Sequence, residues 1–509
     1  MSLRSNGRLS RRQALKALSL AAAGTSLSPL LSGCRNALVT EEDVERGVRR
    51  DALDGKPRFL ITIAAAGGAS IIDSFLAVRA SEAGSNAARL NTFPDSAVQA
   101  VSGSPFRAVR YMGPRLGAIP IAVNTNQLAF AQKYRDDMLV ATSTGTSVNH
   151  VIAQKRAITG NAAWKGRTLQ EAVALQWGQG FPLPNVNMAV GGFAERGTDG
   201  SLPASCYAET VTGPSLWPLG LDGAKGIRGA PSRDVVELAR RARNELDDGS
   251  VFGRTFGGSD ALTRWRTQRA DGAKLEVQDL ITKLNVIPDM PPQIPLSQYG
   301  LSSSPDGARL RQVFPEFFTD PFEAQAALAF LLLKHRVSVA VTIGPDFNVT
   351  VGGPNGIANP PLAFDYSHND HRGGQAYMWA RILGIIDRLV TLLKAEPFDA
   401  TESLWDRTML YVATDFGRTR GRPDNAMEFG TGHDLNNGFL LMSPMVKGNT
   451  VLGGVDAATT MAYGFDPRTG QAQPGKYVSN EPDIYSGVLT AMGADLTGSG
   501  LPDASAFKG

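Results

Sequence analysis

The sequence predicts an α/β protein in which helices cover both faces of one mostly parallel β-sheet. The first observation is a set of short, almost entirely apolar segments, such as residues 58–66 and 337–343, which is typical of parallel strands buried on both faces. The second is that segments of helical periodicity, such as residues 374–395, alternate with these strands. The third is that Asp415 directly follows an apolar strand, as expected where ligands gather at the carboxyl edge of an open sheet. A three-layer α/β/α fold follows.

The expected elements alternate along the chain. Strands are expected at residues 58–66, 118–123, 138–143, 186–190, 337–343, 409–414 and 438–442. Helices are expected at residues 127–135, 232–248, 258–284, 306–318, 320–334, 374–395 and 482–492, and one more begins near His150. β-Branched residues favour the strand at 337–343, whereas the run of alanines and leucines at 320–334 favours a buried helix.

One stretch breaks the alternation. Strands fade between residues 192 and 320, where Gly- and Pro-rich loops separate segments of helical periodicity. An insertion of this kind between strands of one sheet usually covers the carboxyl edge and shapes access to it. We therefore predict one domain at residues 56–509, with residues 192–320 as a largely helical, cap-like insertion.

Composition and charge limit the class of protein. With 509 residues, of which 42% are hydrophobic and 19% charged, the chain is long enough for one large core. The first 33 residues carry five basic side chains and no acid, so a formal charge of +3 for the whole chain leaves −2 for residues 34–509. A near-neutral body without basic runs lacks the electrostatic footprint of a nucleic-acid-binding protein. We therefore expect no nucleic-acid partner.

The amino terminus has the pattern of an export signal. Arg11 and Arg12 precede a weakly apolar stretch at residues 17–31, and a Leu-Ser-Gly-Cys sequence ends at Cys34. The paired arginines resemble a twin-arginine signal and the last four residues resemble a bacterial lipobox. A surface helix with a chance cysteine is the alternative. We predict that residues 1–33 are a signal peptide and that lipidated Cys34 anchors a periplasmic or cell-envelope protein to a membrane.

The segment after the signal is predicted to be a spacer. Residues 34–55 are charged and polar, which favours a linker that holds the folded domain off the membrane. With Cys34 lipidated, Cys206 is the one remaining cysteine, so no internal disulfide can form. The stability of the domain must therefore come from the packing of its core.

Residues 364–438 form the candidate active site. This stretch holds three of the five histidines, in a loop, helix, strand and loop arrangement with carboxylates at its turns. The acidic and imidazole side chains in question are Asp365, His368, His371, Asp415 and His433. Carboxylates and imidazoles together are ligands for zinc, manganese or calcium.

Other polar side chains near strand ends are open to two interpretations. Asp73 lies just beyond the first strand, where it can cap a helix or bind a metal. Thr146 and Ser147 lie between a strand and a helix, where a hydroxyl can cap the helix or attack a phosphate or sulfate ester. Arg418 can bind an anion through its planar guanidinium or serve as a structural ion-pair partner.

Several motifs taken together resemble a known family. They are the Gly67-Gly68 turn, Asn149-His150-Val151-Ile152-Ala153-Gln154 closing in Thr159-Gly160, Asp365-Tyr366-Ser367-His368, Asp415-Phe416-Gly417-Arg418-Thr419 and Gly430-Thr431-Gly432-His433. Over nearly all of the chain after Gly55, the sequence resembles the alkaline phosphatase and sulfatase superfamily, specifically a divergent member of the bacterial family called domain of unknown function 1501. The Phe-Gly-Arg-Thr stretch followed by the Gly-rich His loop is the most specific part. The resemblance implies an alkaline-phosphatase-like fold.

The resemblance also implies a metal site and a reaction. Asp73, Asp365, His368, Asp415 and His433 match positions that bind one or two divalent metals in the superfamily, and His371 is the alternative to His368. Ser147 or Thr146 would replace the family serine as nucleophile, assisted by His150 and Arg418. The implied substrate is a small anionic ester, and the implied cofactor is zinc, manganese or calcium.

Departures from the family pattern leave two functional classes open. Ser70 stands where the family has aspartate, Asn149 stands where it has the nucleophilic serine, the Asp-Thr-His motif has gained a residue, and Gly432 replaces the aspartate before His433. The first class is an exported, membrane-tethered, metal-dependent hydrolase of phosphate or sulfate esters. The second is a non-catalytic envelope lipoprotein that keeps the fold as a binding or assembly surface. The hydrolase requires a bound metal and a hydroxyl within reach of it, and the binding protein requires neither.

Overall fold

The computed structural model describes residues 55–111, 115–116, 119–120, 126–145, 147–160, 163–189, 195–221, 229–259, 262–263, 265–266, 278–346, 363–426, 428–476 and 481–509. The part of the chain that the structure describes divides into two compact units, the first within residues 215–312 and the second comprising residues 55–214 and 313–509. The predicted signal peptide, Cys34 and Thr146 lie outside the described residues, and so does the predicted linker apart from Gly55.

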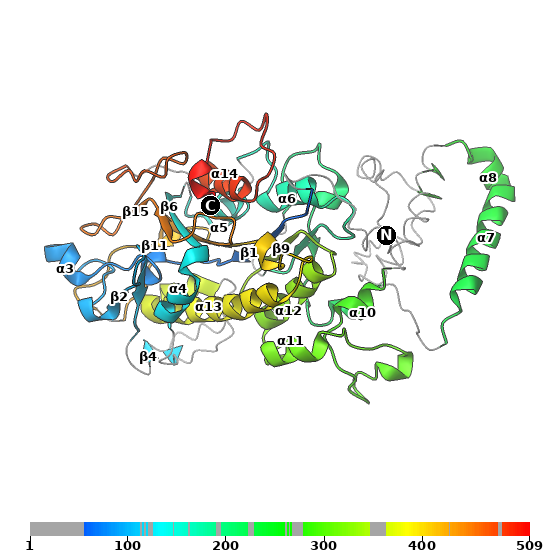
Figure 1. Cartoon of the computed structure of the whole chain (residues 1–509), viewed down its shortest axis with the longest axis horizontal. Helices are drawn as coiled ribbons and strands as arrows, with labels where there is room; N and C mark the ends of the chain where they lie inside the picture. The colour runs from blue at the N-terminus through cyan, green and yellow to red at the C-terminus, as the bar shows by residue number, and fades with distance from the viewer. Residues whose placement is uncertain are drawn as a thin grey trace, which may run out of the picture. The chain divides into compact units, whose positions relative to one another are not determined.

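An eight-stranded sheet forms the centre of the second unit (Figure 1). Its strands are β1 (Phe59–Ala64), β6 (Met138–Thr144), β7 (Asn185–Asn187), β8 (Glu209–Thr210), β9 (Ala340–Ile343), β10 (Thr408–Ala413), β13 (Asn436–Met442) and β14 (Thr450–Leu452). Their spatial order is β14-β6-β13-β10-β1-β9-β7-β8. Every neighbouring pair is parallel except the two pairs that β13 makes with β10 and β6. The predicted α/β fold with a mostly parallel sheet is therefore confirmed.

The central strands explain the continuous apolar runs of the sequence. β1 lies between β9 and β10, and every residue of the three strands is buried. A strand with neighbours on both sides and helices over both faces has no position for a solvated side chain. Ala64 pairs with Ala413, so β1 and β10 end at the same edge and pass directly into the turns that carry polar side chains.

Helices lie on both sides of the sheet (Figure 1). Figure 1 places α6 (Leu169–Trp177) and α14 (Glu481–Ala491) on one side, and α4 (Gln127–Tyr134), α12 (Pro321–Lys334) and α13 (His371–Ala395) on the other. α12 is buried from Phe322 to Leu333, as its alanine- and leucine-rich sequence predicts. α13 begins at His371, three residues before the predicted start, because Asp370 caps it by accepting a hydrogen bond from Gly373 N at 3.0 Å.

Some elements differ from the sequence prediction. The described part of the strand expected at residues 118–123 is β5 (Ile119–Pro120), which pairs with β4 (Arg115–Leu116) in a small hairpin instead of the central sheet. The helix expected after Thr146 begins as α5 (His150–Ala153) and continues as a π-helix, η5 (Gln154–Ile158). The strands β8 and β14 were not predicted, because two- and three-residue strands at the sheet edges show no hydrophobic period.

The described part of the first unit is largely helical. It contains α7 (Arg233–Gly249), α8 (Val251–Phe256) and α10 (Leu280–Leu284), and α11 (Gly307–Val313) begins within it. The insertion predicted at residues 192–320 includes this unit, but residues 195–214, with β8, belong to the unit that holds the sheet. Its role as a cap stays a prediction. No helix in the described parts of the chain has both the length and the apolar composition that crossing a bilayer requires.

Candidate metal centre

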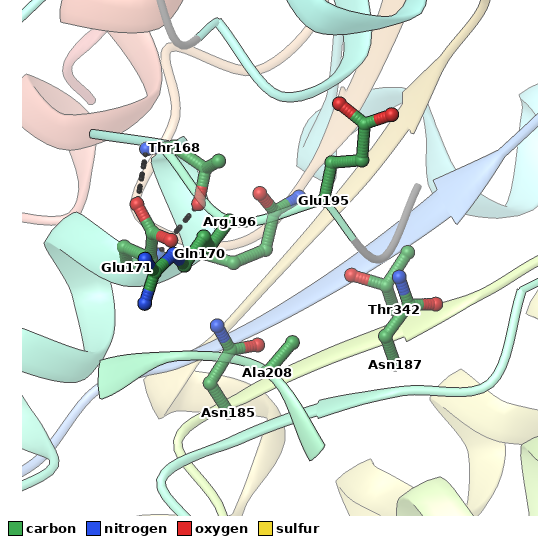
Figure 2. A pocket seen from close by; sticks show the side chains of 9 residues that line it. All are labelled: Thr168, Gln170, Glu171, Asn185, Asn187, Glu195, Arg196, Ala208 and Thr342. Atoms are coloured by element: carbon green, nitrogen blue, oxygen red, sulfur yellow. Dashed lines mark hydrogen bonds between the residues drawn. The ribbon is translucent and has the colours of Figure 1, made fainter. Parts of the chain in front are cut away.

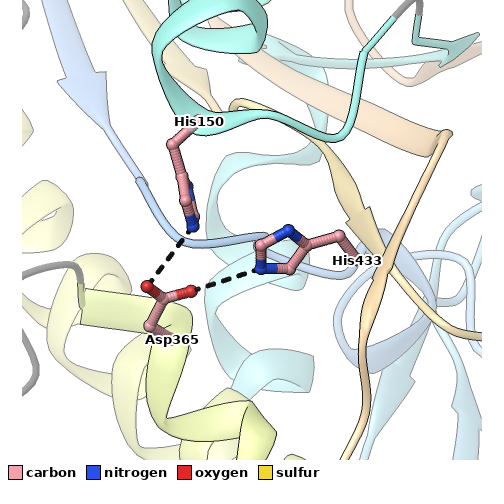
Figure 3. Close-up of side chains that lie close together, drawn as sticks. All are labelled: His150, Asp365 and His433. Carbon is pink, nitrogen blue, oxygen red and sulfur yellow. Dashed lines mark ion pairs between the residues drawn. The ribbon is translucent and has the colours of Figure 1, made fainter.

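Three side chains from distant parts of the sequence converge at the carboxyl edge of the sheet (Figure 3). His150 begins α5 after β6, Asp365 lies in the 3-10 helix η9 (Ala363–His368), and His433 lies in β12 (His433–Asp434) just before β13. Nε2 of His150 lies 3.5 Å from Oδ2 of Asp365, and Nε2 of His433 lies 3.9 Å from Oδ1 of the same carboxylate. One donor atom from each residue lies within 4.8 Å of the others.

These distances fit a divalent cation. Two ligands of a tetrahedral zinc ion, each about 2.1 Å from the metal, lie about 3.4 Å apart. A fourth donor is also present, because Nε2 of His368 lies 3.0 Å from Nε2 of His433 and 3.8 Å from Oδ1 of Asp365. Two imidazoles and one carboxylate, with a third imidazole beside them, favour zinc or a similar transition metal over calcium, which prefers oxygen ligands. The site therefore has the donor set of a zinc centre.

Hydrogen bonds determine which ring nitrogen of each histidine faces the cluster. Nδ1 of His433 lies 2.9 Å from the carbonyl oxygen of Val148, to which it can only donate, so Nε2 carries the lone pair of the neutral ring. Nδ1 of His150 lies 2.8 Å from Oδ2 of Asp415, and its Nε2 faces Asp365. The buried ring of Phe416 packs against both imidazoles, with centroid separations of 4.1 Å to His433 and 4.7 Å to His150. Both ligand orientations are thus held by their surroundings.

Asp415 contacts the cluster through His150, on the side of the imidazole ring that faces away from Asp365. Its buried carboxylate accepts hydrogen bonds from the backbone nitrogens of Gly67 at 3.1 Å and Gly68 at 3.0 Å, in addition to the bond from His150. Gly67 and Gly68 have φ values of +93° and +87°, and a Cβ on Gly67 would lie 2.6 Å from the backbone nitrogen of Asp365. This turn therefore requires glycine. In this arrangement Asp415 orients a histidine ligand, whereas the sequence interpretation made it a ligand itself.

The first prediction concerns this orienting carboxylate. Asp415→Asn would present an amide N–H to Nδ1 of His150, which favours the tautomer with its proton on Nε2 and removes the lone pair that a metal needs. We expect zinc affinity to fall about 10- to 100-fold, as is usual for outer-shell changes. Competition with a chelating dye measures the affinity. Unchanged affinity in a folded Asn variant would exclude the orienting role.

Arg418 holds Asp365 in place. Its side chain is fully buried, and Nη2 donates to Oδ1 of Asp365 at 2.7 Å and to the carbonyl oxygens of Gly67 and Phe364. Nη1 donates to the carbonyl oxygen of Thr431 at 3.3 Å. Burial lowers the pKa of Arg418, although the charge of Asp365 acts in the opposite direction. Of the two roles that the sequence left open for Arg418, these contacts favour the structural ion pair over an anion site.

The protonation of the imidazoles also bears on metal binding. Burial lowers the pKa of His433 and of His368, and the positive charge of Arg418 acts in the same direction on both. The neutral ring is the form that binds a metal. Burial also lowers the pKa of His150, but the hydrogen bond and the charge of Asp415 outweigh it and raise the pKa above its usual value. Protons therefore compete more strongly with a metal at His150 than at a histidine of ordinary pKa.

The structure does not bring Asp73 and His371 to these residues. Oδ2 of Asp73 lies 3.0 Å from Nε2 of His371 and 2.9 Å from Nδ2 of Asn91, and Oδ1 lies 3.4 Å from Nη1 of Arg372. All four side chains are buried. The separation from His368 arises because η9 ends at His368 and Asp370 starts a new helix, which turns His371 into the core. Between the two histidines, the structure thus places His368 beside Asp365.

The second prediction follows from the buried carboxylate. Burial raises the pKa of Asp73, but the charge and hydrogen bond of His371 and the charge of Arg372 outweigh it and lower the pKa to about 2. Because the folded pKa lies below the unfolded one, the stabilisation is complete above pH 4 and is lost as the pH falls toward about 2. Urea unfolding between pH 5 and pH 2 should therefore show a steeper loss of stability in the natural protein than in Asp73→Asn. Equal slopes would contradict the assignment.

Of the two predicted nucleophiles, Ser147 is the one among the described residues, and it lies in the loop between β6 and α5. Ser147 is half-buried, and its Oγ accepts a hydrogen bond from the backbone nitrogen of Asn149 at 3.1 Å. Asn149 caps α5, with its Oδ1 accepting from Ile152 N at 3.4 Å. The next residue after Ser147 is Val148, whose carbonyl oxygen holds His433. The loop of Ser147 therefore contacts a ligand of the cluster directly.

A polar pocket lies beside α6, β7 and β9, away from the candidate metal centre (Figure 2). Its lining includes the buried side chains of Gln170, Glu171, Asn185 and Asn187, and Oδ1 of Asn185 has no hydrogen-bond partner among the described residues. Glu195, at the same pocket, forms an ion pair with Lys155 of η5. The amide side chains that line this pocket form hydrogen bonds within the fold. Nδ2 of Asn185 donates to the carbonyl oxygen of Cys206 at 3.0 Å, and Nε2 of Gln170 donates to Oγ1 of Thr62 at 3.0 Å. None of the predicted site residues lines it.

Comparisons with known proteins give one similarity. No family model matches the chain, and no curated protein matches it. Among solved structures, the chain is similar to a protein in the alkaline phosphatase superfamily from Vibrio parahaemolyticus, with 10% sequence identity, 86% of this chain and 70% of that chain covered, and a TM-score of 0.22. This is the superfamily that the motifs resemble. At this sequence identity and TM-score, the similarity bears on neither the activity nor the site.

Proposed function

We propose that the protein is a metal-dependent hydrolase of phosphate or sulfate esters. The observation that carries the proposal is the convergence of His150, Asp365 and His433, with His368 beside them, at the carboxyl edge of the sheet. A divalent cation bound there would supply a Lewis acid for a phosphoryl or sulfuryl oxygen. The resemblance of the motifs to the alkaline phosphatase and sulfatase superfamily, and to its family called domain of unknown function 1501, supports the same class of reaction.

In this proposal the chain's own residues have separate roles. His150, His433 and Asp365 hold the cation, and His368 lies beside them. Asp415 keeps His150 in the binding tautomer, and Arg418 fixes Asp365. Ser147 is the candidate nucleophile, because its loop contacts His433 through Val148 and its oxygen already accepts a bond from Asn149, so that its own proton can be given to a base. Thr146, which lies outside the described residues, is the alternative nucleophile.

The third prediction tests the hydroxyl. Ser147→Ala in the zinc-loaded protein should lower the rate of aryl phosphate or aryl sulfate cleavage by about 1,000-fold or more, as loss of a nucleophile does, while the zinc content stays the same. The matched control is Ser499→Ala, because Oγ of Ser499 accepts from Leu501 N at 3.1 Å in the same kind of turn. A Ser147→Ala variant as active as the natural protein would assign the nucleophile elsewhere. A zinc-loaded natural protein inert toward both ester classes would end the hydrolase proposal.

The second candidate is a non-catalytic envelope lipoprotein that uses the same surface for binding. Two observations favour it: Asn149 occupies the position of the family serine, and Arg418, for which anion binding was one of two possible roles, is buried against Asp365. Such a protein would bind a metal or an anion without cleaving an ester. The panel of aryl esters described above therefore separates the two functions.

We also propose that the protein is exported by the twin-arginine route and anchored in the periplasm or cell envelope through diacylated Cys34. The order of paired arginines, apolar stretch and Leu-Ser-Gly-Cys sequence supports this. Mass spectrometry of the mature amino-terminal peptide should find a lipid-modified Cys34. An unprocessed amino terminus in the cell envelope would contradict it.

A further inference from the structure

Thr431 is a buried residue between two glycines, two positions before His433 of the candidate metal centre. A Cβ on Gly430 would overlap the carbonyl oxygen of His368, so the loop passes directly against the end of η9. Because Gly430 and Gly432 have no side chains, Thr431 carries the one side chain with which residues 430–432 can be anchored.

The hydrogen bonds of Thr431 tie the loop of His433 to η9. Its backbone nitrogen donates to the carbonyl oxygen of Ser367 at 2.8 Å, and its Oγ1 lies 3.3 Å from the same oxygen. Ser367 lies between Asp365 and His368, the two residues of η9 whose side chains face His433. The position of Thr431 therefore bears on the distance between His433 and the other donors of the cluster.

The buried imidazole of His371 holds the hydroxyl of Thr431 from the other side. Nδ1 of His371 lies 3.0 Å from Oγ1 of Thr431, and Nε2 lies 3.0 Å from Oδ2 of Asp73. The backbone nitrogen of His371 also donates to the carbonyl oxygen of Phe429 at 2.8 Å, and the rings of these two residues stack with a centroid separation of 5.4 Å. A hydroxyl can both donate and accept, so it bonds to Nδ1 whichever ring nitrogen carries the proton. These contacts join the loop to the start of α13.

Carboxylate, imidazole and hydroxyl occur here in the order of a catalytic triad. A nucleophilic hydroxyl must lie where a substrate can reach it. Asp73 and His371 are 0% exposed and Thr431 is 4% exposed, so an ester has no access to this hydroxyl. The series is therefore suited to holding the loop and not to attacking a substrate.

Resting on the metal centre of the proposed function, we propose that Asp73, His371 and Thr431 form a positioning series for that centre. Asp73 orients the ring of His371, the ring holds the hydroxyl of Thr431, and Thr431 keeps His433 beside Asp365. In the structure, Nε2 of His433 lies 3.9 Å from Oδ1 of Asp365. Groups that orient metal ligands raise the affinity of a site, because the protein then has the binding geometry before the metal arrives.

Zinc binding by variants of the full chain tests the hydroxyl. Thr431→Val keeps the shape of the side chain and removes the hydroxyl, whereas Thr431→Ser keeps the hydroxyl. We expect Thr431→Val to bind zinc about tenfold more weakly than the natural protein, and Thr431→Ser to bind it within about threefold of the natural affinity. Competition with a chelating dye measures the affinity. The visible absorption of the cobalt-loaded proteins reports the ligand geometry, which should change in Thr431→Val and not in Thr431→Ser.

The matched control is Thr408→Val. Thr408 is fully buried at the start of β10, and its Oγ1 donates to the carbonyl oxygen of Leu404 at 2.6 Å. This variant also loses a buried hydroxyl and its hydrogen bond, but at the end of β10 that lies farther from Asp415. We expect its zinc affinity to stay within about twofold of the natural value.

His371→Gln is a second probe of the same series. A glutamine amide can still donate to Asp73 from the place of Nε2, but it has no atom at the place of Nδ1. We expect this variant to bind zinc more weakly than the natural protein. If Thr431→Val did not fold, natural zinc affinity in folded His371→Gln would overturn the inference.

The outcomes separate this inference from the proposed function. Unchanged zinc affinity in Thr431→Val, an equal loss in Thr431→Ser, or an equal loss in Thr408→Val would each overturn the inference alone. A natural protein that binds no zinc would end both the inference and the metal centre on which it rests. A protein that shows the expected zinc affinities but cleaves no aryl ester would support the inference while ending the hydrolase proposal.

Discussion

Asp73→Asn is expected to lower the free energy of unfolding by about 3–5 kcal/mol without changing the metal content, because it breaks a buried ion pair by removing one partner. The carboxylate of Asp73 is fully buried between His371, Arg372 and Asn91. Asparagine keeps its volume but removes the carboxylate that lies 3.4 Å from Nη1 of Arg372 and 3.0 Å from Nε2 of His371. Urea denaturation measures the loss of stability, and elemental analysis of the folded variant measures the metal.

The control for this variant is an exposed ion pair. Asp424 lies 3.0 Å from Nε of Arg89, with side chains 68% and 80% exposed, so Asp424→Asn should cost less than about 1 kcal/mol. If Asp73→Asn instead kept its stability and lost its metal, Asp73 would be a ligand, as the superfamily resemblance implies.

His433→Ala is expected to lower zinc affinity by more than the roughly 100-fold that marks the upper range for outer-shell changes. It removes a donor whose Nε2 faces both Asp365 and His368. The fold should persist, since the side chain of His433 is partly exposed and its loss leaves no buried charge unpaired. Zinc titration against a chelator of known affinity measures the change.

His335→Ala is the comparison for this substitution, because His335 follows α12, outside the cluster. It should bind zinc as the natural protein does. A His433→Ala variant with full affinity, together with a His371→Ala variant that has lost it, would move the metal to the buried Asp73 cluster.

The parts of the fold that could be predicted are the segments whose residues are apolar at nearly every position, because such segments must be buried. β1 and β10 are apolar at nearly every position, and α12 is buried on all sides, so composition alone identifies them. The direction of β13 could not be read in the same way, because an apolar run is the same in a parallel and an antiparallel strand. An apolar run also does not reveal which strand it pairs with. Residues 118–123 form such a run, but Ile119–Pro120 pairs with the nearby Arg115–Leu116 instead of joining the central sheet.

The sequence predicted most of the residues of the site, but not which of them lie close enough together to share a metal ion. Asp365 and His433 follow from the motifs, and His150, expected as a catalytic residue, faces the same carboxylate. The choice between His368 and His371 depends on Asp370, whose cap starts α13 between them. The groups that hydrogen-bond to two of the histidines could not be predicted: Asn91 and Thr431 contact His371, and the carbonyl oxygen of Val148 contacts His433. A backbone oxygen or a single polar side chain has no pattern in the sequence.

Anomalous diffraction at the zinc edge from crystals of the zinc-loaded protein tests the central claim most directly. We predict a peak within coordination distance, about 2.0–2.2 Å, of Nε2 of His150, Nε2 of His433 and a carboxylate oxygen of Asp365. A peak beside Asp73 and His371, or no peak in a crystal of protein that has been saturated with zinc, would contradict the claim that these three residues form a metal centre.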